Sequence, residues 1–256
     1  MTPDTGRRPL IAGNWKLWGT RAQAAEYCER LGSLLTADLS ADVAVCAPFT
    51  SLDVCVEALR ETTVSVFAQN MHHEQTGAFT GEVSAEMLTE LDVDGVVLGH
   101  SERREYNCES DRALQEKVPR ALDAGLLPVL CVGETEEERE RGDTERKLRH
   151  QVQEGLEKVP LERLHEVVVA YEPIWAIGTG LTATPEQAQD AVAFVRARVQ
   201  GFDKEAGNRV RVLYGGSMKA DNAAEILSQP DVDGGLIGGV SLDAESFAAI
   251  VEAARA

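Results

Sequence analysis

Eight short apolar runs recur along the whole length of the chain, and they constrain its fold more than any other feature. They lie at Pro9–Gly13, Asp42–Ala47, Val64–Ala68, Gly95–Gly99, Leu126–Val132, Val167–Tyr171, Val210–Tyr214 and Gly234–Ile237. Each run is about as long as a β-strand, and most are rich in Val, Ile or Leu without a clean alternation of polar and apolar positions. Such runs are typical of strands that are buried on both faces, as in a parallel sheet.

Helical patterns fill the gaps between these runs. The clearest begins at Thr184, which can cap a helix, with Pro185 suited to the first helical position and Gln187 placed to complete a capping box. Apolar residues then form one stripe at Ala188, Val192, Val195 and Val199. Helical composition also marks Arg21–Thr36, Leu52–Arg60, Asp111–Asp123, Asp143–Lys158, Asp221–Ser228 and Ala244–Ala254.

The regular alternation of apolar runs and helical stretches predicts an α/β fold. Strands and helices that alternate in this way form either a doubly wound sheet or a closed barrel. The chain has 256 residues, and no Pro/Ser-rich linker or low-complexity stretch divides it. Eight units without a break in composition favour a single (β/α)8 barrel domain over residues 1–256.

The charge balance argues against two classes of partner. The sequence has 25 Lys and Arg residues against 43 Asp and Glu residues, for a formal net charge of −18. Non-specific nucleic-acid binding and docking on anionic membranes both need clusters of Lys and Arg. We therefore expect neither nucleic acid nor membrane as a partner.

Several absences in the sequence favour a cytoplasmic protein without a metal site. No apolar run approaches the roughly 18 residues of a membrane helix, and the segment Met1–Arg8 lacks the hydrophobic region of a secretory signal. The five cysteines are odd in number and irregularly spaced, which favours reduced thiols. No HExxH motif, zinc-spaced Cys/His cluster or Gly-Lys dipeptide of a P-loop occurs.

Polar residues and glycines follow most of the predicted strands at their carboxyl ends, where a (β/α)8 barrel gathers its active site. They include Asn14, Lys16, Gln69, Asn70, His100, Glu102, Glu134, Glu172, Gly215–Ser217, Gly238 and Gly239. A carboxylate can take a proton from a carbon next to a carbonyl, whereas a neutral imidazole and an ammonium group can stabilise negative charge on oxygen. Backbone N–H groups in glycine-rich turns bind phosphate. These residues predict proton transfer on a small phosphorylated carbonyl compound, without metal or cofactor.

Seven motifs, in order along the chain, resemble the triosephosphate isomerase family. They are GNWK at Gly13–Lys16, GAFTGE at Gly77–Glu82, GHSERR at Gly99–Arg104, CVGE at Cys131–Glu134, AYEPIWAIGTG at Ala170–Gly180, YGGS at Tyr214–Ser217 and the Gly238-Gly239 pair. The resemblance implies a TIM barrel that interconverts dihydroxyacetone phosphate and D-glyceraldehyde 3-phosphate through an enediolate. It also implies a place in glycolysis and gluconeogenesis. The family is a standard example of a tuned Glu/His pair and of lid closure.

The resemblance also implies a role for individual residues. Glu172 would be the base that moves a proton between two carbons, His100 the neutral electrophile and Lys16 the electrostatic stabiliser, with Glu102 close to Lys16. Substrate binding would involve Asn14, Lys16, Gly178, Ser217, Gly238 and Gly239, the glycines and the serine holding the phosphate through backbone N–H groups. The segment Pro173–Ala183 would be the mobile lid that excludes water from the reaction.

A homodimer is expected through the loop Met71–Gly81. The loop is long and carries Phe79, and an apolar residue on a protruding loop needs burial. The family buries this loop in a pocket of the second subunit, and a tetramer is the alternative. The neighbouring His72 and His73 are expected at an interface or on the loop surface and have no assigned chemistry.

Two departures from the family pattern bear on details. Leu181 stands where Lys is common in the lid, which leaves the kinetics of the lid open. Trp18 stands where Asn is frequent, beside the loop that meets the partner subunit, which leaves the details of the dimer contact open. Neither departure removes a catalytic group.

Three other interpretations compete with this one. A pentulose-phosphate epimerase would resemble the chain only at its phosphate end and would normally want a metal site. A catalytically silent paralogue should have lost a residue such as Asn14 or Lys16, and none is lost. A nucleotide-binding reading of Gly178–Ala183 is disfavoured, because the motif begins seven residues after the predicted strand and does not open a helix directly.

Overall fold

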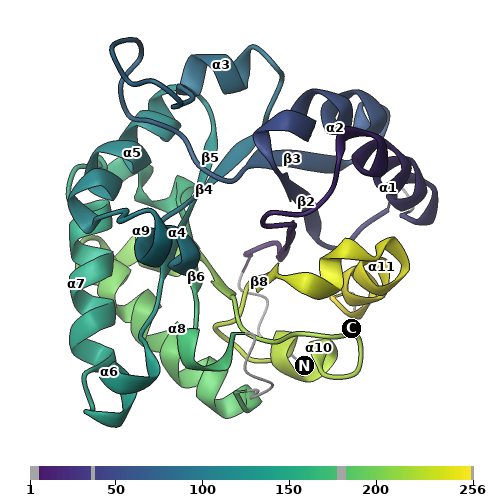
Figure 1. Cartoon of the computed structure of the whole chain (residues 1–256). Coiled ribbons are helices and arrows are strands. Elements are labelled where there is room, and N and C mark those ends of the chain that lie inside the picture. Colours follow the sequence, from purple (N-terminus) through teal and green to yellow (C-terminus); the bar gives the residue numbers. More distant parts are fainter. Residues whose placement is uncertain (1–5, 36–37, 178–182, 255–256) are drawn as a thin grey trace.

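The computed structural model describes residues 6–35, 38–177 and 183–254. Eight parallel strands close into a barrel in which each strand pairs with the next and β8 pairs with β1 (Figure 1). The strands are β1 Leu10–Asn14, β2 Asp42–Ala47, β3 Val64–Ala68, β4 Gly95–Leu98, β5 Leu127–Val132, β6 Val168–Tyr171, β7 Arg211–Tyr214 and β8 Gly234–Ile237. The predicted (β/α)8 barrel is confirmed, and every predicted apolar run overlaps one strand.

Helices surround the barrel (Figure 1). The longer ones are α1 Arg21–Leu34, α2 Leu52–Leu59, α5 Asp111–Asp123, α7 Thr144–Leu156, α8 Pro185–Gln200 and α11 Ala244–Ala253. The shorter ones are α3 Ala85–Thr89, α4 Ser101–Tyr106, α6 Glu136–Glu140, α9 Lys204–Arg209 and α10 Ala223–Leu227, with 3₁₀ turns η1 Phe49–Ser51, η2 Leu161–Glu166, η3 Ile174–Ala176 and η4 Gly239–Leu242. Among the described residues, no helix combines the length and apolar character needed to cross a membrane.

The start of α8 follows the sequence prediction closely. Thr184 is the N-cap and its side chain accepts from the backbone N–H of Gln187, while the Gln187 side chain accepts from the backbone of Thr184. The helix buries its predicted apolar stripe toward the barrel. The capping box therefore fixes the residue at which α8 begins.

Two apolar layers explain why the strands lack polar alternation. Alternate residues of the strands, such as Leu10, Ala12 and Val97, pack together inside the barrel. The residues between them, such as Ile11 and Val96, pack outward against the helices. Both faces of the sheet are thus removed from water, so apolar side chains are favoured at nearly every position.

The closure between β8 and β1 depends on a glycine. Gly234 pairs with Leu10 and has a φ of +133°, a conformation that side chains rarely adopt. A Cβ atom at this position would lie 1.9 Å from the carbonyl oxygen of Leu10. Only glycine allows the two strands to approach this closely.

A buried ionic cluster fastens α8 to the entry of β8. Arg196 is 5% exposed and forms ion pairs with Asp231 and Asp233. Asp233 also accepts from the backbone N–H of Val212 in β7 and pairs with Arg7. The cluster joins α8, β7, β8 and the start of the chain at the amino-terminal end of the barrel.

Replacing Arg196 with Met should destabilise the barrel strongly. Removing one partner of a buried ion pair leaves uncompensated charge and costs roughly 3–5 kcal/mol. The measurement is the shift of the urea unfolding midpoint at fixed protein concentration. The control is Arg198→Met on the same helix, where no ion pair forms among the described residues and the expected loss is below about 1 kcal/mol. Equal losses in the two variants would contradict the role of the cluster.

Candidate active site

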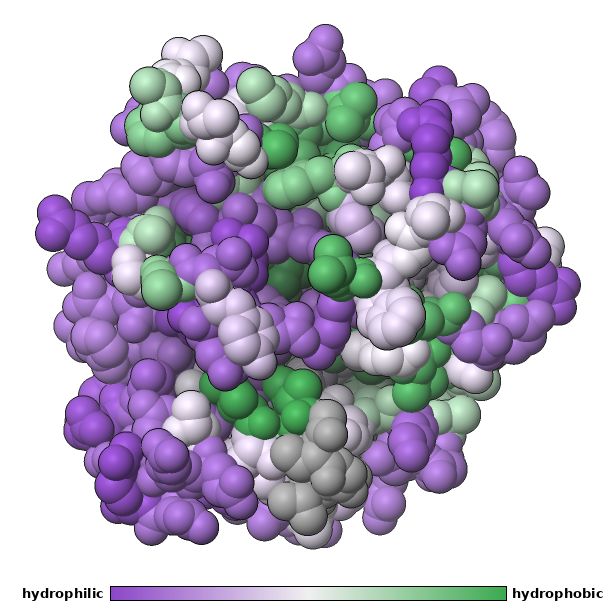
Figure 2. Space-filling model, in the orientation of Figure 1, coloured by the Kyte–Doolittle hydropathy of each residue, from purple (hydrophilic) through white to green (hydrophobic). Residues whose placement is uncertain are grey.

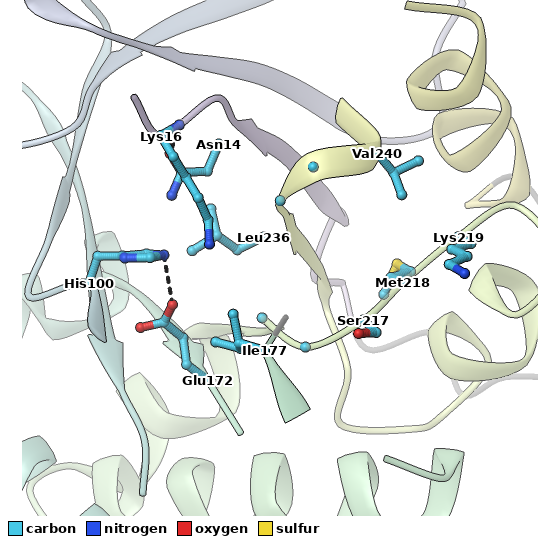
Figure 3. A pocket seen from close by; sticks show the side chains of 14 residues that line it. Asn14, Lys16, His100, Glu172, Ile177, Ser217, Met218, Lys219, Leu236 and Val240 are labelled. Carbon is cyan, nitrogen blue, oxygen red and sulfur yellow. Dashed lines mark hydrogen bonds and ion pairs between the residues drawn. The ribbon is translucent and has the colours of Figure 1, made fainter. Parts of the chain in front are cut away.

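A cavity of about 390 Å³ opens at the carboxyl ends of the strands. Side chains or backbone from five strand ends line it, after β1, β4, β6, β7 and β8 (Figure 3). The cavity brings together the predicted site residues Asn14, Lys16, His100, Glu172, Ser217, Gly238 and Gly239. Gly178 and Leu181 lie outside the described residues.

Glu172 and His100 form a buried pair at the floor of the cavity. The Nε2 atom of His100 lies 2.9 Å from Oε1 of Glu172, and the two residues are 6% and 2% exposed (Figure 3). The backbone N–H of Ser101 donates to the other carboxylate oxygen at 2.9 Å. Burial disfavours the charged carboxylate, but the nearby imidazole and these hydrogen bonds outweigh burial and lower the pKa of Glu172. The site therefore holds an ionised carboxylate out of water.

His100 is also the N-cap of α4. Its Nδ1 atom accepts a hydrogen bond from the backbone N–H of Glu102 at 3.3 Å. An atom that accepts a hydrogen bond carries no proton, so this contact favours a tautomer with its proton on Nε2, where it is donated to Glu172. Burial lowers the pKa of His100, but the charge and hydrogen bond of Glu172 outweigh it and raise the pKa overall. The protonation of the imidazole is thus coupled to the position of the Glu172 carboxylate.

Lys16 is held by an unusual backbone conformation. Its φ is +53°, in the left-handed region that residues other than glycine rarely occupy. The Lys16 N–H donates to Oδ1 of Asn14 at 3.0 Å, and Gln69 Nε2 donates to the Lys16 carbonyl at 2.9 Å. The Lys16 ammonium lies 2.6 Å from Oε1 of Glu102. Asn14 on β1 and Gln69 just after β3 therefore hold the strained turn that points the ammonium into the cavity.

Gln69 is one residue whose function the sequence analysis missed. Its position after a strand was noted, but no role was assigned. In the structure its amide donates to the carbonyls of both Lys16 and Cys46. The signal in the sequence was only its place at a strand end, because the partners are 53 and 23 residues away in the chain.

The opposite wall of the cavity consists of glycine turns after β7 and β8. Gly239 begins η4, and a Cβ atom there would meet nothing within 4 Å, so the backbone borders open space. Ser217 donates through Oγ to the carbonyl of Ala176 at 3.4 Å. Lys219 also lines this end of the cavity and was not singled out in the sequence. Backbone N–H groups and a cation at one end of a cavity suit a phosphate group.

Glu134 anchors the segment that follows Glu172. It is fully buried and accepts from the hydroxyl of Tyr171 at 3.0 Å, from Nε1 of Trp175 at 3.0 Å and from Arg139 at 3.3 Å. Burial raises the pKa of Glu134, and these donors partly offset that effect. Trp175 lies in η3, so Glu134 fixes how the chain leaves β6.

Cys131 lies behind the site rather than in it. It is fully buried in the apolar cluster inside the barrel, and burial raises the pKa of its thiol well above the ordinary value. A protonated thiol surrounded by apolar side chains is a poor nucleophile. Its position agrees with a packing role.

The surface around the cavity is mostly hydrophilic, with hydrophobic residues scattered near the barrel mouth (Figure 2). Within residues 6–35, 38–177 and 183–254, no group of three or more His, Cys, Asp or Glu side chains is placed to hold a metal ion. The cofactor-free reaction expected from the sequence remains a prediction.

The chain is similar to known proteins over almost its whole length. The sequence profile of the triosephosphate isomerase family matches residues 9–254. Proteins named triosephosphate isomerase from Carboxydothermus hydrogenoformans and Clostridium novyi are 49% and 50% identical to it, each over 96% of this chain and 98% of the relative. The protein of that name from Herminiimonas arsenicoxydans is 47% identical over 97% of this chain and 100% of its own length. This chain belongs to the triosephosphate isomerase family.

Proposed function

We propose that this chain, as one catalytic domain, interconverts dihydroxyacetone phosphate and D-glyceraldehyde 3-phosphate through an enediolate. As a member of the triosephosphate isomerase family, it is an isomerase. One observation supports the assignment of Lys16, His100 and Glu172 as catalytic residues. A base, an imidazole and an ammonium group from three different strand ends enter one cavity whose far wall suits a phosphate.

Glu172 acts as the base in this proposal. Its carboxylate is ionised and buried, and therefore poorly hydrated, which favours proton abstraction from carbon. In the structure it is held by His100 and by the backbone N–H of Ser101. The substrate takes the place of the contact with His100, and the carboxylate then carries a proton from one carbon of the triose to the next.

His100 and Lys16 stabilise the enediolate oxygens. The Nε2–H of His100 is a donor aimed into the cavity, while the backbone N–H at Nδ1 opposes a second proton on the ring. When the substrate separates His100 from Glu172, the main cause of the raised His100 pKa is removed and the neutral imidazole is favoured. The Lys16 ammonium adds fixed positive charge, and Asn14 holds the turn that places it.

Backbone N–H groups bind the substrate phosphate in this proposal. Ser217, Gly238 and Gly239 line the wall of the cavity that suits a phosphate. The family resemblance adds Gly178, which lies outside the described residues, as a fourth phosphate-binding residue. The lid Pro173–Ala183 closes over the phosphate and excludes water, because an exposed enediolate phosphate can eliminate its phosphate instead of completing the isomerisation. Glu134 and Ser217 support the described part of this lid through Trp175 and Ala176.

The cellular setting is also part of the proposal. A triose-phosphate isomerase serves glycolysis and gluconeogenesis, which implies a cytoplasmic protein. All five cysteines are free thiols, which agrees with a reducing compartment.

We further propose that the chain works as a homodimer through the loop Met71–Gly81. Phe79 in this loop is 44% exposed, and Leu17 and Trp18 on the loop after β1 are 95% and 65% exposed. Large apolar side chains on protruding loops need a partner surface. A symmetric dimer in which each loop docks against the other subunit would bury them.

Replacing Glu172 with Asp should slow the reaction while leaving substrate binding nearly intact. The shorter side chain withdraws the carboxylate by one methylene, and a misplacement of about 1 Å can lower kcat roughly 100-fold. Coupled assays in both directions measure kcat and KM for the wild type and the variant. The surface substitution Glu205→Asp is the control and should leave both unchanged. An inactive, folded wild type would overturn the proposed function, and full kcat in Glu172→Asp would overturn the role of Glu172.

Replacing His100 with Asn should lower kcat with little change in KM. The loss of a donor that acts on developing oxyanion charge costs roughly 100- to 1,000-fold in kcat. The same assays measure it, with His165→Asn on η2 as the control substitution. An effect confined to KM would contradict the proposed electrophile.

Replacing Phe79 with Ser should weaken the dimer by roughly 100-fold or more, because both subunits lose a buried apolar contact. Sedimentation velocity over a range of protein concentrations gives the dissociation constant. Leu161→Ser is the matched control, since Leu161 is 53% exposed but lies on η2. A wild type that sediments as a monomer at all concentrations would overturn the dimer, and a stable tetramer would replace it.

A further inference from the structure

Three aromatic rings stack on one another in the loop Met71–Gly81. The imidazoles of His72 and His73 have their centroids 4.5 Å apart at an interplanar angle of 23°. The ring of Phe79 covers the other side of His72 at 4.2 Å and 33°. Phe79 lies seven residues further along the chain than His72, so the stack joins two positions near opposite ends of the loop.

The loop is also fixed to the protein at the same point. The backbone N–H of His72 donates to the carbonyl of Val83 at 2.7 Å, and His72 forms an isolated β-bridge with Ser84. Ser84 in turn caps α3. The imidazole of His72 thus lies between the fixed start of the loop and the exposed ring of Phe79.

The hydrogen bonds of the loop require a neutral His72. Its Nδ1 atom accepts from the backbone N–H of Glu74 at 3.1 Å, which an Nδ1 atom with a proton cannot do. The Nδ1 atom of His73 is buried and has no hydrogen-bond partner among the described residues. A proton on Nδ1 of His72 would therefore break the contact with the Glu74 N–H.

The charged groups around the stack do not remove this preference. The carboxylates of Glu74 and Glu82 face His72 and favour its protonation. The side chains of His73 and Lys117 oppose its protonation. Burial is the largest effect, and together with the two cationic groups it lowers the pKa of His72. His73 faces Glu74, with its Nε2 atom 3.8 Å from the carboxylate, and Glu116 on α5.

We propose that the His72–His73–Phe79 ring stack is a pH-sensitive latch on the loop Met71–Gly81, closed while His72 is neutral and released when His72 is protonated. Protonation of His72 removes the acceptor for the Glu74 N–H. Because the closed loop disfavours the proton, its stability is complete above the ordinary imidazole pKa of about 6.5 and falls as pH drops below that value.

The consequence for the oligomer rests on the proposed homodimer. If the loop docks in the partner subunit, release of the latch removes an interface element from both subunits at once. The dimer is then expected to weaken as the pH becomes mildly acidic, while the catalytic cavity itself contains neither histidine of the latch.

The first test measures the latch directly and does not depend on the oligomeric state. The protein labelled with ¹³C-histidine is titrated by NMR, and His72 is assigned by its loss in His72→Gln. His72 should titrate below its ordinary range in the wild type and at a higher pH in His73→Phe, which keeps a stacked ring but removes its charge. A wild-type His72 that titrates at or above the ordinary range, or no upward shift in His73→Phe, would overturn the latch.

The second test measures the effect on assembly by sedimentation velocity at pH 8 and pH 5.5. The dimer dissociation constant of the wild type should rise at least about tenfold between these pH values, and that of His73→Phe by less than about threefold. The remote substitution His165→Gln should behave as the wild type.

The outcomes separate the two proposals. If the protein is monomeric at pH 8 but shows the expected titration of His72, the proposed dimer is overturned and the proposed latch is supported. A dimer whose pH dependence is the same in wild type and His73→Phe overturns the latch as a control of assembly, whatever the isomerase activity.

Discussion

Closure of the parallel sheet is the constraint on which the rest of the molecule depends. Because every strand runs in the same direction, all carboxyl ends lie on one rim, and residues more than 150 positions apart meet there, such as Asn14 and Glu172. The glycine contact between Gly234 and Leu10 completes the ring. Without that closure, the β8 turn at Gly238 and Gly239 would not face Lys16 across a cavity.

The site combines a locally polar pocket with a strongly acidic chain. The net charge is −18, yet the proposed substrate is an anion. At physiological ionic strength exposed charges are screened over roughly 8 Å, so distant surface carboxylates have little effect inside the cavity. The local balance is set by Lys16, by the coupled Glu172–His100 pair and by the backbone N–H groups of the turns. Burial makes each of these interactions stronger than it would be in water.

The loop Met71–Gly81 combines an exposed apolar side chain with a pair of stacked imidazoles. The exposed Phe79 belongs to a motif of the family, whereas the stacked pair His72–His73 is a property read from the positions of the rings. A site built on strand ends is held by two apolar layers, but a protruding loop is held by a few side chains. Titration of one such side chain is therefore able to act on the loop without reaching the site.

The class of fold and the residue types at the rim of the barrel follow from the amino-acid sequence alone. Apolar runs of strand length without alternation are typical of strands buried on both faces, and the capping box at Thr184 needs only local contacts. The short helices α3, α4 and α9 were not predicted, because five or six residues are too few to show a helical period. The same limit hid the N-cap role of His100.

The orientation and charge of the site residues depend on contacts between distant parts of the chain. The left-handed turn at Lys16, the bridge from Gln69 to two carbonyls and the three donors to Glu134 all join residues from different strands. The pKa directions of Glu172 and His100 follow from their distance and burial, which no local pattern encodes. The hydrophobic pattern of the sequence indicates which residues are buried. The hydrogen bonds and charge states of the site residues depend on contacts that form only when the barrel closes.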